Sequence, residues 1–411
     1  MAEYYDALET RDPEEREREL MAALPRQIAL AKERSPHFAR LLEKVKPGEI
    51  TDRRALVDLP VTRKSDLAER QKAQPPFGGL TTVPNGALAR IFMSPGPIYD
   101  PEGRAPDYWR MARALFAAGF RKGDVVHNSF SYHLTPAGSM LESGAHALGC
   151  AVVPGGVGQT ELQLRAINDI RPDGYVGTPS FLRILLEKAA ETGADVSSIS
   201  KALVSGEAFP TSLRAEFAGR GINALQCYGT ADLGLVAYES EAREGLIVDE
   251  GVLVEIVRPG TGDPLPDGEV GEVVVTPLAN SDYPVIRFGT GDLSAVLPGT
   301  SSCGRTNLRI KGWMGRADQA AKVKGLFVHP GQVADVVRRH PEIVKARLVV
   351  DNPDANDRMV LHVEVAPGRS PATEAIVASL RDVTKLRGEV VLHAAGELAN
   401  DGKVIDDIRK F

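Results

Sequence analysis

The chain has 411 residues, of which 43% are hydrophobic and 25% are charged, and its formal net charge is −6. A chain of this length and composition can bury a substantial core and fold into two or three domains. Its charges are spread along the sequence, so no basic face favours nucleic acid or an anionic membrane as a partner. Any anionic ligand must therefore be bound locally.

The cysteine pattern and the N-terminus bear on the compartment. Cys150, Cys227 and Cys303 lie far apart without CxxC spacing, which argues against a disulfide framework or a structural zinc site. The first 21 residues are dense in acids and bases, and no later apolar run is long enough to cross a bilayer. These features predict a cytoplasmic protein with no membrane partner.

Three regions of different character follow one another along the chain. Residues 12–45 carry spaced apolar positions, typical of amphipathic helices packed on a larger body. From about 88 to 275, strand-like runs such as CAVVPGG and KALVSGE alternate with helical patterns such as TELQLRAINDI and PSFLRILLEKAAE, which predicts a parallel α/β sheet. After residue 245, hairpin-like strands joined by Gly, Pro and Asp predict a β-rich, antiparallel or barrel-like subdomain over about 245–315.

The last part of the chain reads as a separate small domain. Strand candidates ARLVVDN, MVLHVEVA and EVVLHAA interleave with helix candidates GQVADVVRRH and ATEAIVASLRDV, a pattern of the α+β class. The predicted fold class is thus α/β, with mixed and parallel sheets in a large N-terminal domain over 1–316. A small α+β C-terminal lid domain is expected over 319–411.

Two Gly-containing stretches carry residues suited to a nucleotide. YGTADLG, from Tyr228 to Gly234, places a ring, a Gly turn, a hydroxyl and the Asp232 carboxylate close together, which can stack a base and orient a metal. The alternative is a core tyrosine and a solvated cap. In YPVIRFGTGDLS, a strand delivers Arg287 and a Gly-rich turn presents Asp292, which can accept hydrogen bonds from both ribose hydroxyls. Alternatively, Arg287 and Asp292 pair across the turn.

Two basic stretches lie nearer the C-terminus. GRADQAAKVKG adds Arg316 and Lys322 where the domain style changes, which suggests a hinge, although a solvated linker with surface charges is the competing interpretation. In the tail DGKVIDDIRKF, Lys403 follows an Asp-Gly turn and could reach a distant site, or it is simply solvated. The eight histidines show no zinc-site spacing, so no metal beyond magnesium is indicated.

These four stretches, in this order, resemble the motifs of the adenylate-forming superfamily, and their detail is most similar to the phenylacetate-CoA ligase family. LPVTRKSDL (59–67), PFGGLTTVP (76–84), residues 152–182, SGEAFP (205–210) and LFVHPGQV (326–333) resemble segments of the same family. The likeness covers roughly residues 50–335 and, more faintly, the tail. It implies that ATP and Mg²⁺ convert an aromatic carboxylate to an acyl-adenylate, which coenzyme A then attacks to give a thioester. It also implies a homodimer and a mobile lid that rotates between the two steps.

The resemblance implies a set of site residues, carried over position by position. Catalytic roles fall to Lys403, Asp232 and Arg316, with Asp232 at the magnesium position and Asp318 at the hinge. Asp292 would hold the ribose, and Gly325 would border the thiol tunnel. The cofactor-binding set comprises Ser205, Gly206, Glu207, Ala208, Gln226, Cys227, Tyr228, Gly229, Thr230, Asp292, Arg316, Lys322 and Gly325. The acyl-pocket candidates are Tyr132, His133, Pro154, Gly155 and Gly156, with His133 as a core or surface residue the alternative.

Two departures from the family pattern keep other functions open. Where the family has a Ser/Thr/Gly-rich phosphate loop ending in lysine, residues 93–103 read MSPGPIYDPEG, in which prolines lack N–H donors and acids repel phosphate. Ala231 replaces the usual hydroxyl residue, and Asp232 replaces the usual Glu. An aryl-CoA ligase is favoured. The alternatives are an adenylate-forming enzyme with an amine or carrier-protein acceptor, and a weakened homologue that binds nucleotide or acyl-CoA.

Overall fold

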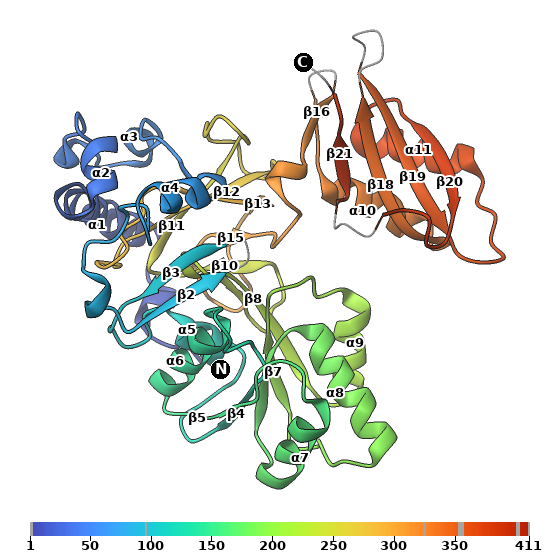
Figure 1. The fold of residues 1–411 in the computed structure, drawn as a ribbon, viewed down its shortest axis with the longest axis horizontal. Coiled ribbons are helices and arrows are strands. Elements are labelled where there is room, and N and C mark those ends of the chain that lie inside the picture. The colour runs from blue at the N-terminus through green and yellow to red at the C-terminus, as the bar shows by residue number, and fades with distance from the viewer. Residues whose placement is uncertain (1–2, 95–96, 324–325, 352–356, 400–402, 410–411) are drawn as a thin grey trace. The chain divides into compact units, whose positions relative to one another are not determined.

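The computed structural model describes residues 3–94, 97–323, 326–351, 357–399 and 403–409 (Figure 1). The chain divides into two compact units. The first comprises Met1–Thr290 and Ala295–Gly312, and the second comprises Gly291–Ser294 and Trp313–Phe411. Among the described residues, no helix combines the length and the apolar composition needed to cross a bilayer.

The first unit is built on a nine-stranded sheet in the order β14-β15-β10-β9-β8-β7-β6-β4-β5. Its five parallel strands are β4 (Val125–Asn128), β5 (Ala151–Pro154), β6 (Gly174–Gly177), β7 (Lys201–Val204) and β8 (Asn223–Thr230). The antiparallel part consists of β9 (Gly234–Glu239), β10 (Leu246–Val248), β14 (Val296–Leu297) and β15 (Arg309–Ile310). The predicted parallel α/β sheet is therefore confirmed.

Helices cover both faces of this sheet, because neighbouring strand residues point to opposite sides. On one face, Val176 and Leu203 pack with α5 (Met111–Ala117) and α6 (Ala137–Leu148). On the other face, Tyr175 and Ala202 pack with α7 (Thr160–Ile170), α8 (Pro179–Thr192) and α9 (Thr211–Gly219) (Figure 1). This double burial explains why the parallel strands read as continuous apolar runs.

A second sheet in the first unit has the order β1-β13-β12-β11. β11 (Val252–Val257) and β12 (Gly271–Pro277) form the predicted antiparallel hairpin, whereas β1 (Thr62–Arg63) pairs in parallel with β13 (Phe288–Ser294). The segment 245–315 therefore supplies strands to both sheets, because β10, β14 and β15 extend the larger one. A separate hairpin, β2 (Arg90–Ser94) and β3 (Ile98–Glu102), contains most of the segment that replaces the family's phosphate loop.

The predicted N-terminal helices are also confirmed. α1 (Pro13–Arg34) and α2 (Pro36–Leu41) place Leu24, Ile28 and Phe38 in one core with residues of β11, β12 and β13. α3 (Arg53–Val57) and α4 (Leu67–Ala73) follow, and the short 3₁₀ helices are η1 (Ala7–Thr10), η2 (Pro47–Glu49), η3 (Lys64–Asp66) and η4 (Asn85–Ala87).

The second unit contains a four-stranded sheet in the order β20-β19-β18-β21. β18 (Ile343–Asp351), β19 (Arg358–Val365) and β20 (Glu389–Ala394) are the three predicted strands, and α10 (Pro330–Arg339) and α11 (Thr373–Thr384) are the two predicted helices. η5 (Ala317–Gln319), β16 (Ala321–Val323), β17 (Leu326–Val328) and β21 (Ile405–Asp407) are additional elements. Each has three residues, too short to show a periodic pattern.

Candidate active site

The first part of the candidate site lies at the carboxyl ends of the adjacent strands β7 and β8, where Ser205 meets Cys227. Val204 of β7 pairs with Gln226 of β8, and Ser205 Oγ donates a hydrogen bond of 2.8 Å to the Cys227 carbonyl. Ligands of open α/β sheets bind at this end of the strands. Burial raises the pKa of the Cys227 thiol to about 12, so this side chain packs in the core and is no nucleophile.

The predicted loop after β7 is open to solvent. Gly206 adopts a positive φ of 85°, and the residues Gly206, Glu207 and Ala208 are exposed. Glu207 Oε1 accepts a hydrogen bond of 2.7 Å from the Ser180 amide in the first turn of α8. The loop therefore presents backbone groups to solvent while one side chain ties it to a helix N-terminus.

The YGTADLG stretch differs from its predicted form. β8 continues through Tyr228, Gly229 and Thr230 and pairs with β9, so these residues belong to a strand and only residues 231–233 turn. The Tyr228 hydroxyl donates to Thr290 Oγ1 at 3.2 Å. The strand carries Asp232 into the interior, where it is 2% exposed, so its interpretation as a solvated cap is wrong.

Asp232 lies in a buried polar cluster that the sequence did not reveal. Lys64 Nζ donates to Asp232 Oδ2 at 2.7 Å. Asp100, from the β2–β3 hairpin, is fully buried, and its pKa is raised to about 7, first by burial and then by the charge of Asp232. The buried hydroxyl of Tyr283 has a raised pKa because of burial and of the charges of Asp232 and Asp100. The segment LPVTRKSDL, which contains Lys64, resembles the family, but nothing in the sequence predicts that Lys64 pairs with Asp232, 168 positions away.

Arg287 does not pair with Asp292, so that alternative is wrong. Its guanidinium, 2% exposed, donates to both oxygens of Glu255 at 2.9 and 3.1 Å and also to three backbone carbonyls, those of Val57, Leu59 and Gly262. The residue precedes β13 at a positive φ of 45°, and the Gly-rich run 289–292 forms strand instead of the predicted turn. Arg287 therefore locks the second sheet to the N-terminal helices.

Asp292 and Arg316 are brought together in the second unit. The Arg316 guanidinium lies 3.1 Å from Asp292 Oδ1, and the Trp313 indole donates to the same oxygen at 3.2 Å. The backbones of Asp292 and Arg316 also form an isolated antiparallel bridge. A Cβ at Gly291 would lie 2.8 Å from the Arg316 guanidinium, so glycine permits this close approach.

The remaining predicted residues of the second unit are only partly described. Lys403 is exposed, and its Nζ lies 2.8 Å from Asp406 Oδ1. The next residue, Val404, donates its amide to Gln319 Oε1 at 3.0 Å, which places the tail beside η5. Lys322 lies in β16, and Gly325 falls outside the described residues.

The acyl-pocket candidates gather after β4 and β5, around a glutamine that the sequence did not single out. Pro154 ends β5 and is exposed, and Gly155 and Gly156 follow it. Gln163 of α7 donates to the carbonyls of Gly156 at 2.9 Å and Gly158 at 2.6 Å. A Cβ at Gly155 would lie 2.8 Å from Gln163 Oε1, so the loop needs glycine there.

Gln163 also connects this loop to the end of β4. Its Oε1 lies 2.8 Å from His127 Nε2 and accepts a hydrogen bond of the same length from Ser129 Oγ. Burial lowers the pKa of His127, which keeps the ring neutral. The sequence did not predict this buried contact, because His127 matches no metal-binding spacing and nothing else in the sequence marks it as a functional residue.

Tyr132 and His133 differ in their surroundings. The Tyr132 hydroxyl donates to Glu142 at 2.7 Å and accepts from the Asn128 amide at 2.8 Å, so its ring is held against β4 and α6. His133 is exposed, and its backbone amide donates to Ser131 Oγ at 3.2 Å. The surface alternative for His133 therefore describes its position.

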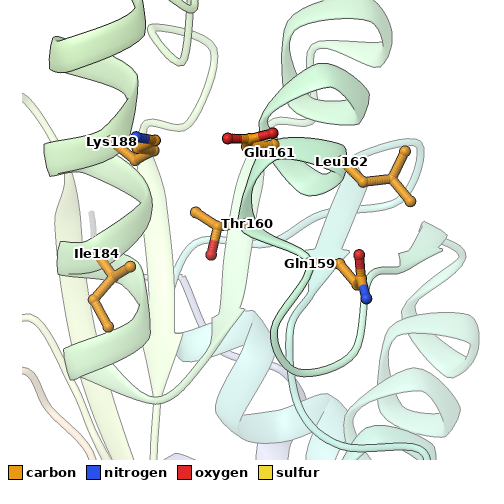
Figure 2. Close-up of a pocket in the computed structure, with 6 residues that line it drawn as sticks. All are labelled: Gln159, Thr160, Glu161, Leu162, Ile184 and Lys188. Carbon is orange, nitrogen blue, oxygen red and sulfur yellow. The ribbon is translucent and has the colours of Figure 1, made fainter.

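A surface hollow elsewhere contains none of the predicted site residues. Figure 2 shows its lining residues at the start of α7 and along one face of α8. The volume of the hollow is about 370 Å³. Its lining residues are Gln159, Thr160, Glu161, Leu162, Ile184 and Lys188. The chemistry of the strand ends, and not cavity volume, identifies the candidate site.

Known proteins resemble this chain over most of its length. Residues 112–277 match the family of AMP-binding enzymes. The phenylacetate-coenzyme A ligase of Thermus thermophilus is 34% identical over 381 residues, covering 88% of this chain and 84% of that ligase. The phenylacetate-coenzyme A ligase of Aromatoleum evansii is 32% identical, covering 85% and 82%. The solved structure of an open conformation of 2-hydroxyisobutyryl-CoA ligase, in complex with 2-HIB-AMP and CoA, shares the fold, with a TM-score of 0.85, 24% identity, and coverage of 97% of this chain and 93% of that one.

The chain is an adenylate-forming enzyme. Its parallel sheet is covered by helices on both faces, the candidate site lies at the carboxyl ends of β7 and β8, and residues 112–277 match the AMP-binding enzymes. This class contains many acid-activating enzymes, and the sequence identity to known ligases shows which family within the class this chain belongs to. The chain belongs to the phenylacetate-CoA ligase family, as its motifs had indicated.

Proposed function

We propose that this chain activates an aromatic carboxylic acid with ATP, as an acyl-adenylate, and transfers the acyl group to coenzyme A. The observation that carries the proposal is the 34% identity to a phenylacetate-coenzyme A ligase over 88% of the chain. No contact in the described residues favours an amine or a carrier protein as the acceptor instead. The small residues at 154–156 leave room for an aromatic ring, and Asn128 links them to Tyr132, since its carbonyl accepts from the Gly156 amide and its side chain donates to the Tyr132 hydroxyl.

In the first unit, the proposed nucleotide contacts follow from the strand ends. The exposed backbone of 206–208 and the side chains of Ser205 and Tyr228 are suited to a purine and its polar edge. Tyr228 keeps its ring half-buried and its hydroxyl anchored on Thr290, so the ring is oriented before any base stacks on it. Preorganised contacts of this kind reduce the entropy cost of binding.

In the second unit, we assign ribose binding to Asp292 and a phosphate or ribose contact to Arg316. The 3.1 Å ion pair holds both side chains in a defined geometry. Lys403 is proposed to attend adenylation, Lys322 to contact a cofactor and Gly325 to border the thiol tunnel, with Asp318 at the hinge of a mobile lid. The ion pair of Lys403 with Asp406 is exposed, and exposed ion pairs contribute little stability, so a nucleotide can replace it at a small cost in free energy.

Mg²⁺ is proposed as the metal. Asp232 suits it, since one carboxylate oxygen is held by Lys64 while Oδ1 is buried without a hydrogen-bond partner among the described residues. When bound, Mg²⁺ neutralises charge on phosphate oxygens. The residues of the chain orient the acid and the nucleotide and exclude water from the adenylate.

We further propose a cytoplasmic homodimer. The three cysteines are all free thiols, which suits a reducing compartment. The homodimer rests on the family resemblance alone. Light scattering of the purified protein measures the assembly directly, and a mass of one chain would contradict it.

The test is a panel of aryl and short aliphatic acids incubated with ATP, Mg²⁺ and coenzyme A. Mass detection of the adenylate and the thioester separates the ligase from an enzyme with another acceptor. We expect pyrophosphate release only with aromatic acids, reduced at least about 100-fold by Asp292→Ala and by Lys403→Ala. Lys385→Ala is the matched control, because Lys385 is also exposed and paired at i,i+3 with an aspartate, Asp382. Release that neither site change affects would refute the site assignment.

A further inference from the structure

Two histidines face each other on the sheet of the second unit. His362 lies in β19 and His393 in β20, and these strands pair in parallel (Figure 1). Nδ1 of His362 is 2.9 Å from Nε2 of His393, and the ring centroids are 5.2 Å apart. The two residues are 31 positions apart in the chain, so no spacing in the sequence predicted this contact.

A carboxylate fixes the orientation of His393. Glu397 Oε2 lies 3.3 Å from His393 Nδ1 and accepts a hydrogen bond of 3.1 Å from the Ala394 amide. Because the carboxylate accepts the proton of Nδ1, the neutral ring has its lone pair on Nε2, the nitrogen that faces His362. A ring whose outer nitrogen donates to a carboxylate has the arrangement that most metal-ligating histidines adopt.

The surroundings keep His362 neutral without repelling a cation. Its pKa is lowered, first by burial and then by the charges of His393 and Arg347, and neutral imidazole is the form that binds metal ions. On this face of the sheet, Arg347 is the strand partner of His362 and Lys345 is the strand partner of Glu364. The carboxylates of Glu364 and Glu397 therefore offset the two positive charges from β18.

The separation of the two nitrogens suits one ion. Nitrogen ligands lie about 2.0–2.1 Å from such an ion, so two nitrogens 2.9 Å apart subtend an angle of about 90° at it. This angle is typical of neighbouring ligands in tetragonal Cu²⁺ and Ni²⁺ sites, whereas a tetrahedral Zn²⁺ site needs a wider one. To aim its lone pair at the ion, each ring turns off the line that joins the two nitrogens, which the broad χ2 wells of histidine permit.

Solvent reaches the pair, because β20 is an edge strand of its sheet. The neighbouring Val391 and Leu392 are 39% and 41% exposed, and the His393 side chain is 24% exposed. Among the described residues, no group of three or more His, Cys, Asp or Glu side chains can hold a metal. An ion at this position therefore has two protein nitrogens and takes its other ligands from water.

We propose that His362 and His393 together bind one divalent ion of the Cu²⁺ or Ni²⁺ class. On binding, the proton of His362 moves through water from Nδ1 to Nε2, so both rings stay neutral and no proton is released in net. The proposal does not rest on the proposed function, because its residues lie in the second unit and none of them is assigned to the nucleotide, the acid or coenzyme A.

The test measures metal binding by the full-length protein. Titration calorimetry with Ni²⁺ gives the stoichiometry and the affinity, and electron paramagnetic resonance with Cu²⁺ counts the coordinating nitrogens. We expect one ion per chain with two nitrogen ligands, bound at least about 100-fold more weakly by His362→Gln and by His393→Gln. His146→Gln is the matched control, because it removes an exposed histidine of α6 and should leave the affinity unchanged.

A further variant keeps both ligands and removes only the charge behind His393. Glu397→Gln should lower the Ni²⁺ affinity about tenfold while circular dichroism stays that of the parent. This exposed position decides the case even where a histidine variant fails to fold. No ion bound by the parent, an unchanged affinity in His393→Gln or Glu397→Gln, or an equal loss in His146→Gln overturns the proposal and leaves the contact between the rings as a structural hydrogen bond only.

Discussion

Gln163→Met tests whether one buried amide shapes the proposed acyl pocket. The Gln163 side chain makes four hydrogen bonds of 2.6 to 2.9 Å, two to the carbonyls of Gly156 and Gly158 and two with His127 and Ser129. Methionine fills the same volume without these groups, so no cavity contributes to the effect. His127 and Ser129, 0% and 3% exposed, cannot recover their bonds from water, whereas the half-exposed loop can.

At about 1 kcal/mol for each bond lost, the unfolding free energy should fall by about 2–4 kcal/mol. Release of the 155–158 loop should also raise the KM for the preferred acid about tenfold, equivalent to about 1.4 kcal/mol, and leave the KM for ATP within about twofold. Urea unfolding and steady-state kinetics measure the two effects.

The control is Leu162→Met, at an exposed position of the same helix, which should change neither quantity. Equal unfolding free energies for Gln163→Met and the control would contradict the claim that the hydrogen bonds of Gln163 stabilise the fold. A lower stability with an unchanged KM for the acid would show that the loop does not border the acyl group.

Three further changes test the fold around the site. Arg287→Met leaves Glu255 buried without its partner and should cost about 3–5 kcal/mol in urea unfolding; a cost near zero would contradict the locking role. Burial raises the pKa of the Asp107 carboxyl from 3.8 to about 6, so the folded state binds the carboxyl proton more tightly than the unfolded state does. The free energy of unfolding therefore falls as the pH rises from about 4 to about 6. Asp107→Asn should remove about 2 kcal/mol of this loss between pH 4 and 7, and an unchanged pH profile of unfolding would disprove it. Gly234→Ala places a Cβ 2.6 Å from the Trp109 carbonyl at a positive φ, whereas Gly221→Ala has a similar φ and open space. Gly221→Ala should lower the free energy of unfolding by about 1–2 kcal/mol, and Gly234→Ala should lower it clearly more. Equal decreases in melting temperature would show that the contact between the new Cβ and the Trp109 carbonyl does not destabilise the fold.

The regular elements could be predicted because their signals are local. Apolar residues at helical spacing in 13–34, and short apolar runs at 125–128, 151–154, 174–177 and 201–204, follow directly from which faces are buried. Strands with three residues, such as β21, leave no such pattern. The strand character of Tyr228–Thr230 was missed because Gly229 was interpreted as a turn residue, whereas pairing with β9 decides the conformation.

Side-chain partners were harder to predict, because they join residues far apart in the chain. Lys64 meets Asp232 across 168 positions, and Arg287 meets Glu255 across 32. A charged residue in a single sequence shows its charge but not its burial, so Asp232 was equally compatible with a solvated cap. Gln163 carries no signal at all, since a glutamine on a helix is ordinary until its partners are known.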